Sequence, residues 1–167
     1  LACALKGSAY CKPALDLDLK WGTGTPPADN WTMVIQLVSP IPGETTLRLN
    51  YNHWPGRGLL PTSLWPADRV IHDHYVIPLP DQDRTTQAWS VQVAFFDPES
   101  GSRVPVRVDG ELSGDAATLS LVRVPDGNPP NPADSIKNAL TAEFDGNIRL
   151  LHAKVTQAET GVWQVDL

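Results

Sequence analysis

Two histidines separated by one residue, His72 and His74, are the side chains whose spacing comes nearest to a metal site. Residues two apart on a β-strand point to the same face, so both imidazoles could approach one ion. His53 or Asp68 could join them. Zinc, however, needs three or four ligands that further contacts hold in place, and nothing else has suitable spacing. We therefore expect solvated strand histidines, no metal and no cofactor.

Asp73 lies between the two histidines and belongs to the opposite face of the same strand, together with Ile71 and Tyr75. A carboxylate on a core face must accept hydrogen bonds, because an unpaired buried charge costs several kcal/mol. The preceding Pro-Thr-Ser elbow offers donors, the backbone and hydroxyls of Thr62 and Ser63. We expect Asp73 and Tyr75 to have structural roles with this elbow. The alternative, a catalytic carboxylate, would need a second acid across a cleft.

The stretch 51–58, "YNHWPGRG", could bind a sugar. An exposed indole face suits a pyranose ring, and loops cluster at strand ends. The candidate carbohydrate-binding residues are Tyr51, His53, Trp54 and Arg57. Packing of these aromatic residues in the core or at the elbow is the competing interpretation.

Other chemistries find little support in the sequence. It contains no G-x-S-x-G elbow and no cysteine paired with a histidine motif. The Gly-Thr-Gly-Thr stretch at 22–25 precedes two prolines, which forbid the helix that a phosphate loop needs. The formal net charge is −6 with no basic run, so nucleic acid is not an expected partner.

The opening segment, residues 1–13, contains the two cysteines of the chain, Cys3 and Cys11. In an oxidising compartment they could form a disulfide that closes a small loop. The segment lacks an initiator Met and a signal peptide, and we expect it to begin within a longer chain.

The elements that would position these residues are predicted to be strands. Residues 14–21, "ALDLDLKW", alternate apolar and charged side chains, as a half-buried strand does. Sixteen prolines disfavour long helices. Further strands are expected at 31–40, 45–51, 69–79, 88–97, 103–110, 117–125, 147–157 and 161–167. The predicted fold is an all-β antiparallel sandwich, immunoglobulin-like or jelly-roll-like, with at most one or two short helices.

The sandwich core is expected to span residues 14–125, followed by a Pro-rich linker and short helix at 126–142 and further strands at 143–167. The helix is predicted at 133–144. A short likeness between the two ends indicates that 143–167 starts a second repeat or folds back to complete the first sandwich. Expected core-facing residues are Leu17, Leu19, Val34, Leu37, Ile71, Tyr75, Ile77, Val91, Val93 and Phe95.

Several of these segments together resemble a known family. The stretch "PTSLWPADRVIHDHYVIPLP" (61–80), the turn "FDPESGSR" (96–103), the strand "WTMVIQLV" (31–38) and "FDGNIRLLHAKV" (144–155) are similar to motifs of bacterial extracytoplasmic β-sandwich modules. These modules are attached to membrane proteins resembling dolichyl-phosphate-mannose-type, family-39-like, mannosyltransferases. The likeness covers about residues 14–110 and 143–167. In the family the Phe-x-Gly-x-Ile strand precedes the Trp-Thr strand, whereas here it follows.

The resemblance implies an extracytoplasmic location, periplasmic or at the cell surface, tethered to a membrane through other parts of a parent protein. We expect a non-catalytic spacer or interaction module, with a glycan or a cell-envelope protein as partner. The alternatives are a carbohydrate-binding module that uses the aromatic residues near Trp54 and, third, a small hydrolase.

Overall fold

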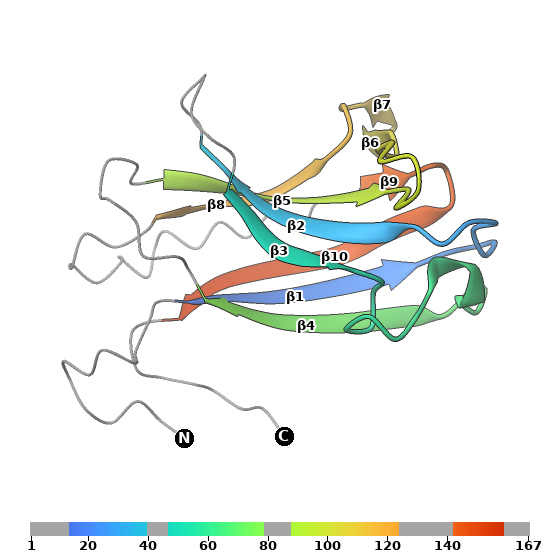
Figure 1. The fold of residues 1–167 in the computed structure, drawn as a ribbon, viewed down its shortest axis with the longest axis horizontal. Helices are drawn as coiled ribbons and strands as arrows, with labels where there is room; N and C mark the ends of the chain where they lie inside the picture. Colours follow the sequence, from blue (N-terminus) through green and yellow to red (C-terminus); the bar gives the residue numbers. More distant parts are fainter. Residues whose placement is uncertain (1–13, 40–46, 79–87, 124–141, 159–167) are drawn as a thin grey trace.

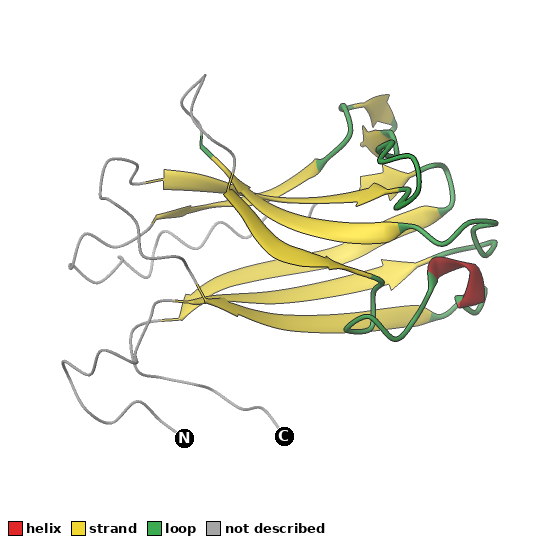
Figure 2. Ribbon diagram, in the orientation of Figure 1, coloured by secondary structure: helices red, strands yellow, loops and turns green. Residues whose placement is uncertain are grey.

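Two antiparallel β-sheets pack face to face as a sandwich (Figure 1). The computed structural model describes residues 14–39, 47–78, 88–123 and 142–158. The predicted all-β class is confirmed. The 3-10 turn η1 (Thr62–Leu64) is the single helical element in these ranges, and none of their helices is long and apolar enough to cross a bilayer (Figure 2).

The larger sheet has six strands in the order β4-β1-β10-β9-β6-β7. These are β4 (Val70–Pro78), β1 (Ala14–Gly22), β10 (Ile148–Ala158), β9 (Ala142–Phe144), β6 (Val106–Val108) and β7 (Glu111–Leu112). The smaller sheet has the order β3-β2-β5-β8. Its strands are β3 (Leu47–His53), β2 (Thr32–Val38), β5 (Ala88–Phe96) and β8 (Ala117–Arg123). Strands β3 and β4, consecutive in the chain, are therefore edge strands of different sheets.

Strand β1 shows how the sequence pattern becomes the core. Leu15, Leu17, Leu19 and Trp21 are all fully buried, while the residues between them lie on the other face. Trp21 packs against Phe95 at 5.3 Å and against Phe144 at 6.1 Å between ring centroids. One aromatic cluster thus joins β1, β5 and β9 across both sheets.

Four expectations need correction, two about secondary-structure elements and two about core residues. The end of the predicted helix 133–144 is strand β9, and the strand expected at 103–110 shortens to β6, followed by the two-residue β7. Val34 is buried but points away from the core cluster, because Met33, Ile35 and Leu37 occupy the inward positions of β2. Ile71 is half-buried at the margin of that cluster. The other predicted core residues, from Leu17 to Phe95, are buried.

The turn after β5 is stabilised by a glycine with positive φ and by the side chain of Asp97. Gly101 adopts a φ of 72°, and Asp97 Oδ1 accepts a hydrogen bond from the Glu99 N–H at 2.9 Å. The Ser100 hydroxyl donates to Asp97 Oδ2 at 2.7 Å. This hydroxyl, and then the Glu99 N–H, lower the pKa of Asp97 from its usual value.

The C-terminal strands complete this sandwich. Strand β10 lies between β1 and β9, and it pairs with β1 from Ala14 opposite Ala158 to Gly22 opposite Arg149. Of the two interpretations offered for 143–167, the described part up to Ala158 fits the one in which the segment folds back. Residues 1–13 with Cys3 and Cys11, the loop 126–135 and the strand expected at 161–167 lie outside the described residues.

We predict that Phe144→Ala destabilises the fold by about 3–5 kcal/mol, the usual cost of removing a buried aromatic ring. Denaturant unfolding would measure it, with Lys154→Ala on the exposed face of β10 as a control that stays within about 0.5 kcal/mol. A Phe144→Ala loss as small as that of the control would show that β9 and β10 are not integral to the sandwich.

Candidate functional site

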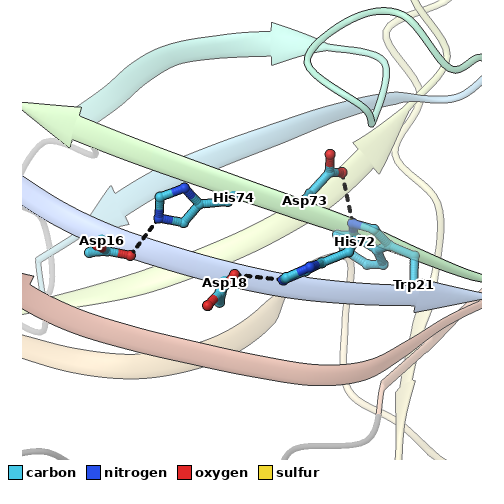
Figure 3. A network of polar contacts seen from close by, with 6 residues as sticks. All are labelled: Asp16, Asp18, Trp21, His72, Asp73 and His74. Atoms are coloured by element: carbon cyan, nitrogen blue, oxygen red, sulfur yellow. Dashed lines mark hydrogen bonds and ion pairs between the residues drawn. The ribbon is translucent and has the colours of Figure 1, made fainter. Parts of the chain in front are cut away.

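Strands β4 and β1 form two histidine–aspartate pairs on the outer face of the six-stranded sheet. The two histidines of β4 turn toward β1, where Asp16 and Asp18 alternate with the buried leucines (Figure 3). His72 Nε2 lies 2.7 Å from Asp18 Oδ1, and His74 Nε2 lies 2.9 Å from Asp16 Oδ1. Both histidines are thus on one face, as predicted, and each contacts one carboxylate of β1.

These pairs are diagonal across the two strands. In the β1–β4 register, His74 stands opposite Asp18, and His72 stands opposite Lys20. Each imidazole therefore reaches two residues along β1 to its carboxylate, which is the spacing of diagonal neighbours. In the part of the chain that the structure describes, no group of three or more His, Cys, Asp or Glu side chains is placed to hold a metal ion.

Asp73 points in the opposite direction, into the sandwich (Figure 3). It stands opposite Leu19 in the register and is 1% exposed, as its face of the strand predicted. Its Oδ2 accepts a hydrogen bond from Trp21 Nε1 at 3.2 Å, and its Oδ1 accepts one from the Gly56 N–H at 2.7 Å. Each oxygen of this buried carboxylate therefore accepts one hydrogen bond, which compensates for the loss of water.

The expected donors, Thr62 and Ser63, bind elsewhere. The Thr62 hydroxyl donates to Asp29 O at 2.6 Å and accepts from the Trp31 N–H at 2.9 Å. The Ser63 hydroxyl donates to Asn30 Oδ1 at 2.6 Å. The elbow thus holds the β1–β2 connection, and the prediction that it binds Asp73 was wrong. Proximity in sequence favoured the elbow, whereas the fold brings the next loop upstream, residues 54–60, over Asp73.

That loop has an unusual backbone. Gly56, Arg57 and Gly58 adopt φ values of 67°, 57° and 84°, so three consecutive residues are in the left-handed region. The conformation is natural for glycine but costly for arginine. Hydrogen bonds within the loop stabilise it, from the Gly58 N–H to Trp54 O at 2.7 Å and from the Leu60 N–H to Pro55 O at 3.0 Å.

Tyr75 lies beside Asp73 under this loop. Burial raises the pKa of its hydroxyl far above the usual value, and the charge of Asp73 raises it further, so the hydroxyl stays protonated. Arg57 acts on this pKa in the opposite direction, through its backbone and its charge, so it lies close to the hydroxyl. The loop therefore meets the Asp73–Tyr75 pair at two consecutive residues, Gly56 through its amide and Arg57 beside the hydroxyl.

An open pocket of about 370 Å³ lies at this edge of the sandwich. It is lined by His53, Arg57, His74, Tyr75 and Val76. The His53 and Tyr75 ring centroids are 5.4 Å apart, so the pocket bridges the edge strands β3 and β4 of the two sheets. His53 Nδ1 lies 2.7 Å from Trp54 O and donates to it, which fixes the ring beside the loop.

The predicted sugar-binding residues are partly brought together. His53 and Arg57 line the pocket, and Trp54, 37% exposed, lies between them in the chain. Tyr51 is in β3 opposite Ile35, and its side chain is outside the described residues. Trp21, Trp65 and Trp89 are buried and Trp31 is half-buried, so packing accounts for most of the tryptophans that the structure describes.

Sequence reasoning missed several residues of this site. His74 and Val76 enter the pocket because β4 is an edge strand, which the sequence did not reveal. The partners of Asp73 were also missed. The Gly-Arg-Gly triplet is a visible signal for a left-handed turn, but nothing local connects it to the carboxylate of Asp73, seventeen residues after Gly56.

Comparison of the chain with protein-family models, with curated proteins and with solved structures found no match. The site is therefore interpreted from its own geometry.

We predict that Asp73→Ala costs about 1–3 kcal/mol, because it leaves the Gly56 N–H and the Trp21 indole without an acceptor. Asp73→Asn should cost less, since the amide oxygen can still accept from Gly56. Denaturant melts would measure both changes. A double change of His72 and His74 to Gln is the control, and it should remain within about 0.5 kcal/mol as for exposed sites. A silent Asp73→Ala would contradict the anchoring role.

Proposed function

We propose that this chain is a non-catalytic β-sandwich interaction module in the extracytoplasmic part of a larger membrane protein. The observation that supports it is the open pocket at the β3–β4 edge. There the edge strands of the two sheets, and the loop that is bound to Asp73, present polar side chains to the pocket. The resemblance of the strand motifs to extracytoplasmic modules supports the location.

The kind of side chains in the pocket favours binding. Arg57 offers hydrogen-bond donors, and Tyr75 and Val76 offer apolar surface. Ligand pockets in general combine an apolar lining with a few convergent polar groups. The two nearest carboxylates already have partners. Asp73 accepts hydrogen bonds from Trp21 and Gly56, and Asp16 is paired with His74. Pairing of this kind suits positioning more than acid–base work, which ranks the hydrolase alternative below the binding one.

Among ligands, a carbohydrate of the cell envelope is favoured over a protein partner by one feature. Trp54 is 37% exposed next to the pocket, held by the bond from His53 to its carbonyl. A half-exposed indole beside hydrogen-bonding groups suits the apolar face and hydroxyl rim of a sugar ring. The row of several exposed tryptophans that many sugar platforms would use is not found in the described ranges, so a single-residue platform is proposed.

The experiment is a screen of bacterial cell-envelope oligosaccharides by array, followed by calorimetry. We predict binding that Trp54→Ala weakens by about ten-fold, since loss of a stacked ring costs on the order of 1–2 kcal/mol. The matched control is Leu121→Ala, an exposed residue on β8 at the other edge of the smaller sheet. If no oligosaccharide binds to folded protein, or if Trp54→Ala binds like the control, the carbohydrate proposal fails and a spacer remains.

A further inference from the structure

The arginine in the left-handed loop is the least expected feature of the pocket. A non-glycine residue with positive φ carries a backbone cost, and such outliers persist where the surroundings over-determine them. The surroundings of Arg57 fix its backbone in this way. Glycines flank it, the Gly56 N–H is bound to buried Asp73, and the Gly58 N–H is bound to Trp54 O. Glycine at this position would relieve the cost, so the choice of arginine points to its side chain.

The side chain of Arg57 is exposed, lines the pocket and enters no ion pair with the residues that the structure describes. By contrast, two other arginines form ion pairs. Arg103 Nη1 lies 3.6 Å from Asp115 Oδ1, and Arg149 Nε lies 3.5 Å from Glu143 Oε2. The acids nearest the pocket are already occupied, since Asp73 is buried beneath the loop and Asp16 is bound to His74. The pocket therefore presents to solvent a guanidinium that has no ion-pair partner among the described residues.

A guanidinium is a planar fork of donors that matches an anionic group with two oxygens, and such charge-assisted pairs are roughly twice as strong as neutral ones. His53 and His74 line the same wall, with His53 Nδ1 bound to Trp54 O and His74 Nε2 bound to Asp16. Trp54 provides an adjoining aromatic surface. A ligand complementary to this set combines a sugar ring with a negative charge.

We propose that the pocket selects an acidic saccharide, a sugar unit that carries a carboxylate or a phosphate, and that Arg57 is the residue that binds the anionic group. This inference rests on the proposed carbohydrate-binding function and adds the ligand class. The loop conformation supports it because Asp73 orients the Gly-Arg-Gly backbone before any ligand arrives, which reduces the ordering cost of binding.

The test compares three probes by calorimetry: a hexuronic-acid oligosaccharide, the neutral hexose oligosaccharide of the same length, and the corresponding hexose phosphate. We expect one of the two acidic probes to bind about ten-fold or more tightly than the neutral one, with an affinity that falls as salt rises. Which acidic probe binds more tightly identifies the anionic group.

The decisive variant is Arg57→Gly. It should remove the preference for acidic probes while the melting temperature stays the same or rises, because glycine adopts the left-handed conformation freely. A merely structural arginine would give the reverse, a lower melting temperature with the preference intact. Arg57→Lys should retain the preference in weaker form, and Arg69→Gly, a basic residue outside the pocket lining, is the charge control.

The failures are separable. If neutral and acidic probes bind equally, or if Arg57→Gly keeps the preference, the acidic specificity is wrong while the carbohydrate function stands. If no probe of any kind binds to folded protein, the proposed carbohydrate function is itself wrong, and this inference falls with it.

Discussion

The buried carboxylate of Asp73 is the constraint on which the site depends. A charge with 1% exposure would cost several kcal/mol if left unpaired, so its donors must be in place whenever the sandwich is folded. One donor, Trp21 Nε1, comes from the neighbouring strand β1 and belongs to the aromatic cluster of the core. The other, the Gly56 N–H, comes from the loop after β3. A single side chain thereby ties the edge strand β4 to the core and to the loop.

The pocket follows from this attachment. The loop leaves one sheet at His53 and returns to the other at Val70, so it must cross the open edge between β3 and β4. The bond to Asp73 fixes that crossing at Gly56, and the left-handed turn then carries Arg57 to the pocket wall. The elbow at Thr62 and Ser63 fixes the later part of the connection to residues 29–31. A long connection is thus held at two points, and the side chains between them are preorganised.

How much the sequence could predict depended on the range of the interaction. Alternation gave the strands, the burial of Leu17 and Leu19, and the inward direction of Asp73, because these are set by the two-residue period of a strand. It could not supply register or sheet order. For that reason the partners of Asp73, the His–Asp pairs and the pocket position of His74 were missed, and Val34 was assigned to the wrong face. The helix expected at 133–144 was wrong at its end because pairing with β6 and β10 made residues 142–144 a strand.

The most direct test of the central claim is amide hydrogen exchange at Gly56, followed by NMR together with the indole N–H of Trp21. Loop amides usually exchange quickly, through local openings of low free energy. Because both groups are bound to a buried carboxylate, we expect them to exchange as slowly as the amides of the central strands β1 and β5. Rapid exchange at Gly56, at the rate of the exposed amides of the turn after β5, would contradict the claim that Asp73 anchors the loop.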